Sequence, residues 1–180
     1  MTLRKIARLG HPVLLGKAEP VDAVASAEVQ SLIADLLETM ADAGGIGLAA
    51  PQVYAPLRLV VAMELADRSE RADAKVHVLV NPELTPVGGD VDLAFEGCLS
   101  IPRLRGRVPR QRRVAYRALD RMGRPVAGEA EGLFARILQH EVDHLDGVLY
   151  PMRMLDLRHL AFDAEMPHLS AWIARQGDRA

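Results

Sequence analysis

Hydrophobic residues recur every three or four positions in the segment over residues 26–43. They follow the spacing i, i+3, i+4, i+7, i+8 and i+11, which places them on one face of a helix: Val29, Leu32, Ile33, Leu36, Leu37 and Met40. Ser26 is a suitable N-cap, and Gly44 and Gly45 end the segment. The pattern predicts an amphipathic helix that packs against a core, preceded by an extended or irregular arm over residues 1–20.

The middle of the chain has the shorter patterns that are typical of strands. Segments rich in Val and Leu, or alternating in polarity, cover residues 57–65, 75–84, 90–95, 114–120 and 126–130. Asn81-Pro82 is expected to end or kink the second of these strands. The polar stretch 66–74 is interpreted as a solvated connection.

A second helix is predicted over residues 131–146, with Gly147 as its stop. Its apolar residues cover more than half of the helical circumference, so this helix is expected to be buried: Leu133, Phe134, Ile137, Leu138, Val142 and Leu145. The segment 156–176 is predicted to be broadly helical, with a break at Pro167. Its apolar residues are expected to dock it on the domain: Leu157, Leu160, Leu169, Trp172 and Ile173.

Composition narrows the class of protein. A chain of 180 residues with 49% hydrophobic residues fits one domain with one core. The formal net charge of −2 predicts no bulk attraction to nucleic acid. The single cysteine, Cys98, excludes an intramolecular disulfide and fits a reducing compartment. No secretory leader and no apolar run of about 20 residues is found, so we expect a soluble cytoplasmic protein without a membrane partner.

Six arginines between residues 103 and 113 form the strongest charge cluster. They are Arg103, Arg105, Arg107, Arg110, Arg112 and Arg113. The spacing of the first three fits one face of a strand, and no aromatic residues interleave for base stacking. We interpret the cluster as a solvated strand face, from which one arginine could line a cleft.

The candidate chemistry lies on the second predicted helix, which contains the pattern His-Glu-x-x-His. His140 and His144 are four residues apart, so they share one face of the helix and can hold one metal ion. Glu141 can then reach the water that the metal activates. Apolar residues flank Glu141 at i−4, i−3 and i+4, and a buried carboxylate is costly unless it is paired with a charge. This setting favours a metal site over a surface helix with two histidines.

A catalytic metal site of this kind needs a third protein ligand. Tyr150 stands where metzincin proteases have their third histidine, which excludes that class. Glu165, 21 residues after His144, could serve as in thermolysin-like proteases, and Cys98, 42 residues before His140, is the other candidate. A zinc endopeptidase and a metal-stabilised domain without turnover therefore stay open at this point.

Three separated motifs resemble the signatures of peptide deformylases, in the same order along the chain. They are residues 45–52 (GIGLAAPQ), 96–100 (EGCLS) and 139–147 (QHEVDHLDG). The resemblance extends over roughly residues 4–160, with Leu15 as a minor departure where a basic residue is common. It implies one α+β catalytic domain over residues 1–180, with small antiparallel sheets around a central buried helix that carries His-Glu-x-x-His.

The resemblance also implies a reaction and its site. The reaction is removal of the formyl group from the N-terminal formylmethionine of new polypeptides, which releases formate. The implied metal ligands are Cys98, His140 and His144, and the metal is Fe(II), replaceable by nickel, cobalt or zinc. Glu141 would be the general base, with Gln52 and the Leu99 N–H as oxyanion donors. The implied substrate-binding residues are Ile46, Gly47, Gly97, Leu99, Arg105, Ile137 and His140. Formylmethionyl peptides and nascent chains are the implied partners, the ribosome surface is a further candidate, and a monomer is expected.

Overall fold

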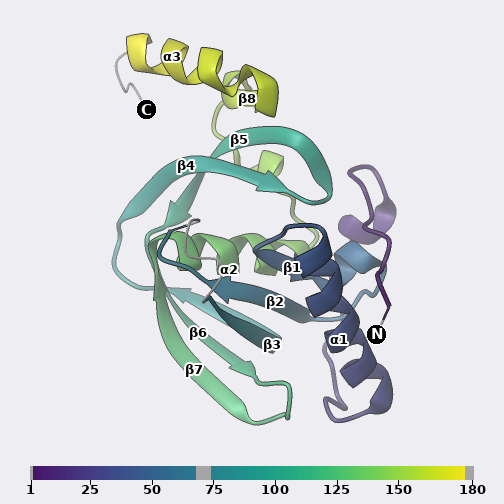
Figure 1. Cartoon of the computed structure of the whole chain (residues 1–180). Coiled ribbons are helices and arrows are strands. Elements are labelled where there is room, and N and C mark those ends of the chain that lie inside the picture. Colours follow the sequence, from purple (N-terminus) through teal and green to yellow (C-terminus); the bar gives the residue numbers. More distant parts are fainter. Residues whose placement is uncertain (1, 68–73, 177–180) are drawn as a thin grey trace.

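Five antiparallel strands form the larger of two sheets in the computed structural model, which describes residues 2–67 and 74–176 (Figure 1). In spatial order they are β1 (Gly47–Ala49), β2 (Leu59–Glu64), β3 (Lys75–Pro86), β6 (Arg113–Leu119) and β7 (Pro125–Glu131). Asn81 adopts φ 51°, and the β3–β6 register shifts between Val80 and Glu83. Asn81-Pro82 therefore kinks β3 without ending it. Most of the expected connection over residues 66–74 lies outside the described residues.

The smaller sheet is a hairpin with one short added strand. It has the order β4 (Val91–Cys98), β5 (Ile101–Gln111) and β8 (Leu160–Phe162), all antiparallel. The two-residue turn Leu99-Ser100 joins β4 to β5 and places Cys98 at the bend. Cys98 is therefore the last residue of β4, and its Sγ lies 3.2 Å from Nε2 of His144 on the second helix.

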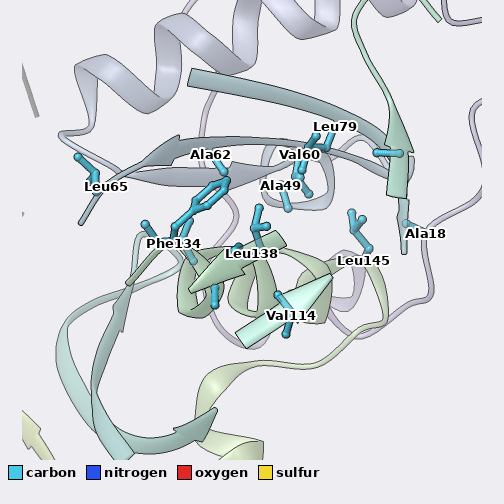
Figure 2. Packing of buried hydrophobic residues seen from close by; sticks show 14 residues of the cluster. Ala18, Ala49, Val60, Ala62, Leu65, Leu79, Val114, Phe134, Leu138 and Leu145 are labelled. Carbon is cyan, nitrogen blue, oxygen red and sulfur yellow. The ribbon is translucent and has the colours of Figure 1, made fainter. Parts of the chain in front are cut away.

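Helix α2 (Gly132–Leu145) lies between the two sheets (Figure 1). Phe134, Leu138 and Leu145 on α2 pack against the larger sheet (Figure 2). The facing residues on β2 are Val60 and Ala62. The predicted buried helix is confirmed, and its position brings His140 and His144 into the interior.

Helix α1 (Ala27–Asp42) covers the other face of the same sheet. The Ser26 hydroxyl accepts a hydrogen bond from the Val29 N–H at 3.3 Å, as expected of an N-cap. Leu59 and Val61 alternate with the α2-facing residues of β2 and pack toward α1. Because side chains alternate along a strand, β2 is buried on both faces, which explains its continuous apolar sequence.

The C-terminal segment differs from the predicted helical tail. The chain passes through short 3₁₀ turns and β8 before α3 (Met166–Gln176) begins. Pro167 stands in the first turn of α3, where a missing N–H costs nothing, so it starts the helix and does not break it. None of the residues of α3 is buried, and Figure 1 shows the helix apart from the core. Leu160 packs as expected, but Leu157 is 68% exposed, so its expected docking is wrong. Leu169, Trp172 and Ile173 are half-buried, and the Trp172 ring lies 6.2 Å from that of His159.

No helix within residues 2–67 and 74–176 has both the length and the apolar character needed to cross a membrane.

Candidate metal and catalytic site

Side chains from two elements converge at the buried centre of the molecule. Cys98 comes from the end of β4, and His140 and His144 come from adjacent turns of α2. One ligand atom from each residue lies within 4.8 Å of the other two, and Cys98 Sγ lies 3.2 Å from His144 Nε2. One thiolate and two imidazoles suit a transition metal and leave a further coordination position open. The three residues therefore fit a bound transition-metal ion, as the His-Glu-x-x-His pattern predicts.

The protonation of these groups also fits metal binding. Burial opposes ionisation of the Cys98 thiol, but His144 and His140 outweigh it, so the pKa of Cys98 lies well below its usual value. Thiolate is the form of cysteine that binds metals. His140 Nδ1 lies 2.9 Å from a carboxylate oxygen of Glu96, which assigns the ring proton to Nδ1 and leaves Nε2 available as a ligand.

Glu96 is the centre of a buried ionic network that the sequence did not predict. Arg110 donates to its two oxygens at 2.8 and 3.0 Å, and Arg136 donates at 2.8 Å. Burial would raise the pKa of Glu96, but the hydrogen bonds from His140 and Arg110 lower it strongly. Arg110 also bonds Asp143 of α2 at 2.5 Å. The network therefore joins the hairpin to the metal-bearing helix and fixes the ring of His140.

Arg110 corrects the interpretation of the arginine cluster as a solvated strand face. Its side chain is only 5% exposed, whereas Arg112 and Arg113 are exposed. Inward-facing positions of β5 have even numbers, as at Gly106 and Val108, so Arg110 follows them into the interior. Arg103, Arg105 and Arg107 have odd numbers and lie toward the other face, and the first two line a cleft.

Glu141 projects from α2 into the same centre and is 5% exposed. Burial raises its pKa to about 7, against the opposing effect of His140 and His144. Its Oε2 atom has no hydrogen-bond partner among the described residues. The carboxylate lies directly against Gly47, where an added Cβ would stand 2.8 Å from Glu141 Cδ. The glycine at position 47 thus allows the close approach of the Glu141 carboxylate.

Gln52 belongs to the 3₁₀ turn Ala50–Val53, which follows β1, and is 2% exposed. Its Oε1 accepts from the Ala49 N–H at 2.8 Å. Its Nε2 donates to Ser100 Oγ at 3.1 Å and approaches Cys98 Sγ at 3.5 Å. The donor end of this amide is therefore aimed at the candidate metal centre.

A cleft of about 510 Å³ opens beside these groups. It is lined by nearly all of the site residues expected from the sequence: Ile46, Gly47, Gln52, Gly97, Cys98, Leu99, Arg105, Ile137, His140 and Glu141. His144 lies beneath the cleft and is 1% exposed. The cleft also has lining residues that the sequence did not indicate, among them Arg8, Leu133 and Asp163. Asp163 follows β8, a strand too short to be recognised from its pattern.

Glu165, the alternative third ligand, is exposed at the end of the 3₁₀ turn Asp163–Glu165. Within residues 2–67 and 74–176, it does not belong to the ligand group formed by Cys98, His140 and His144.

Comparison with known proteins decides the family. The sequence model of the polypeptide deformylase family matches residues 3–159. Peptide deformylase 2 of Bordetella bronchiseptica is 44% identical over 162 residues, which cover 89% of this chain and 92% of the relative. The chain belongs to the polypeptide deformylase family. Peptide deformylase 2 of Pseudomonas putida is also 44% identical, over 164 residues and the same shares of both chains.

Solved deformylase structures share the fold. The Met-Ala-Ser-bound class I type b enzyme of Acinetobacter baumannii has a TM-score of 0.78 and 35% identity, covering 85% of this chain and 99% of that one. The Thermotoga maritima deformylase also has a TM-score of 0.78, with 33% identity over 87% of this chain and 100% of that one. The predicted α+β fold is confirmed. The chain is a deformylase-family enzyme that removes the N-formyl group from nascent polypeptides, and the endopeptidase alternative is not favoured. The family is metal-dependent, and the Cys98, His140 and His144 cluster can bind a metal.

Proposed function

We propose that Cys98, His140 and His144 together hold one divalent metal ion for deformylation, with Fe(II) as the native ion and nickel, cobalt or zinc as substitutes. The single observation that carries this proposal is the convergence of their ligand atoms within 4.8 Å at the base of the cleft. A bound ion of this kind lowers the pKa of water toward neutrality. The proposal covers one catalytic domain over the whole chain.

We propose Glu141 as the group that moves the proton. It takes a proton from the attacking water and returns it to the leaving amine of the methionine. The carboxylate is 5% exposed beside the proposed metal ligands, and its Oε2 atom, which has no partner among the described residues, is available to water. Gly47 leaves the space that the carboxylate occupies.

Two donors are proposed for the oxyanion that forms at the formyl carbon. The Gln52 amide is held by the Ala49 N–H and by Ser100, so its orientation is set before substrate binds. The Leu99 N–H lies in the turn after Cys98 and is the second proposed donor. Donors that are already oriented stabilise developing charge without a cost of rearrangement.

The cleft suits an extended peptide that begins with formylmethionine. Ile46, Leu99 and Ile137 supply an apolar lining for the methionine side chain. β1 and β4 are the edge strands of the two sheets, so Gly47 and Gly97 can hydrogen-bond a peptide backbone as an added strand. Arg105 lies at the rim. The proposed substrates are nascent chains and formylmethionyl peptides, met in the cytoplasm at or near the ribosome surface by a monomeric enzyme.

The proposal is tested by formate release from formyl-Met-Ala-Ser, using oxygen-protected protein loaded with iron, nickel or cobalt. For Glu141→Gln we expect kcat to fall at least about 100-fold, the usual contribution of a general base, with metal content unchanged. Glu38→Gln, on the exposed face of α1, is the matched control and should retain activity. Retained turnover by Glu141→Gln would remove Glu141 from the reaction. One equivalent of metal in Cys98→Ala would contradict the ligand set.

A further inference from the structure

An ion pair crosses the rim of the cleft between the hairpin and the C-terminal segment. Arg105 Nε donates to Asp163 Oδ1 at 2.7 Å, and both residues line the cleft. The pair is accessible, with side-chain exposures of 37% for Arg105 and 48% for Asp163. Asp163 is brought there by β8, whose Ala161 pairs with Arg105 in the β5 ladder. The C-terminal segment thus contributes a charged group to the cleft.

The Arg105 side chain lies along the route of the proposed substrate. Gly97 is its neighbour across the β4–β5 hairpin, and a Cβ at Gly97 would stand 2.9 Å from Arg105 Nη1. The guanidinium therefore lies over Gly97, on the edge strand that borders the cleft. A residue of the substrate downstream of methionine would meet this positive charge. Without Asp163, Arg105 would attract carboxylates and repel ammonium groups.

Asp163 lies beyond the stretch that the family model matches. The family match ends at residue 159, four positions before it. The proposed catalytic groups are all upstream of that limit, on α2, at the end of β4 and in the turns that follow β1 and β4. Asp163 is therefore separate in sequence from the motifs that carry them.

We propose that Asp163 is a specificity-determining residue for this deformylase, resting on the proposed function of the cleft. By neutralising Arg105, its carboxylate lets the enzyme accept acidic, neutral and basic residues after formylmethionine at similar rates. Removing the charge of Asp163 converts the cleft into one that selects acidic peptides. Such tolerance suits an enzyme whose substrates are the N-termini of many different polypeptides.

The test measures kcat/KM for three C-terminally amidated peptides, formyl-Met-Ala-Glu, formyl-Met-Ala-Lys and formyl-Met-Ala-Ser, with metal-loaded enzyme. In Asp163→Asn at low salt, the ratio of kcat/KM for the Glu peptide to kcat/KM for the Lys peptide should rise about fivefold. This is the size of effect expected from one exposed charge pair. Raising the ionic strength from about 0.05 to 0.5 M should reduce this rise, because exposed charges are screened. The ratio cancels any general loss of activity caused by loosening β8.

Two variants complete the design. Asp163→Glu keeps the charge and should keep the wild-type ratio. Glu129→Gln breaks an exposed pair with Arg113 on the larger sheet and should leave the ratio unchanged. An unchanged ratio in Asp163→Asn, or an equal loss for all three peptides, would overturn the proposal. Absence of formate from the Ser peptide with the wild type would instead overturn the proposed function of the site.

Discussion

Gly47 and Glu141 share one space, because the carboxylate occupies the position that a side chain on Gly47 would take. In Gly47→Ala the new Cβ would lie 2.8 Å from Cδ and 2.9 Å from Cγ of Glu141, closer than real Cβ contacts allow. Glu141 must then move. A misplaced general base loses much of its effect, so we expect kcat to fall about 100-fold with metal content unchanged.

The matched control for this variant is Gly89→Ala, whose Cβ would meet nothing within 4 Å. It should retain wild-type kcat in the same formate assay. Wild-type turnover by Gly47→Ala would show that the Glu141 carboxylate acts equally well from a displaced position.

Some residues of the candidate site can be predicted from local sequence patterns, and others cannot. His140, Glu141 and His144 follow from helical periodicity alone, since a spacing of four fixes a shared face. Cys98 and Gln52 lie far upstream. Spacing alone allows either Cys98 or Glu165 as the third ligand, and only the family resemblance favours Cys98. The convergence of Cys98 and Gln52 depends on how β4 and the turn after β1 pack on α2, which local patterns do not encode.

At the scale of elements, Asp35 of α1 holds the N-terminal arm. Its carboxylate accepts from the Thr2 N–H at 2.7 Å and from Arg4 Nε at 2.8 Å, and it is 2% exposed. Burial opposes ionisation, but the bonds from Arg4 and Thr2 outweigh it and lower the pKa of Asp35 below 3.8. Because the pKa of Asp35 is lower in the folded state, its ionisation stabilises the fold at pH values above the pKa of the unfolded state. This stabilisation is lost as the pH falls through the pKa of the folded state.

We therefore expect Asp35→Asn to lower the free energy of unfolding by about 1–2 kcal/mol at pH 7, since Arg4 is partly solvated. The difference from the wild type should shrink as the pH falls below 3.8, the ordinary pKa of an aspartate, because the stabilisation by the carboxylate is then lost. Urea unfolding at pH 7 and at acidic pH measures it, with Asp42→Asn on the exposed end of α1 as the control. A difference that is independent of pH would assign the effect to packing and not to the charge.

Elements with long periodic patterns were predicted well, and short ones were not. The apolar stripes of α1 and α2 extend over several turns, so few other arrangements could bury them. β8 has three residues, fewer than an alternating pattern needs, and it exists because β5 offers an edge for pairing. α3 has a helical pattern, but where a helix packs depends on the path of the chain before it.

At the scale of the whole molecule, a chain of buried charges connects its parts. Arg110 of β5 bonds Glu96 of β4 and Asp143 of α2, and Asp143 also accepts from Arg153 at 2.8 Å. Burial would lower the pKa of Arg110, but Glu96 and Asp143 outweigh it and raise the pKa. Arg110 therefore stays charged between two buried carboxylates, and Glu96 in turn orients the metal ligand His140.

Arg110→Met should consequently affect stability and metal binding together. Removing one partner leaves buried carboxylates uncompensated, so the free energy of unfolding should fall by about 3–5 kcal/mol. Arg110 also holds Glu96, whose carboxylate bonds His140. Loss of Arg110 should therefore weaken metal affinity about 10- to 100-fold, as measured by chelator competition with nickel or zinc. Arg113→Met breaks an exposed pair with Glu129, so it should leave the free energy of unfolding close to the wild-type value and metal affinity unchanged. Equal losses of stability in the two variants would show that the buried network does not hold the sheets and the metal-bearing helix together.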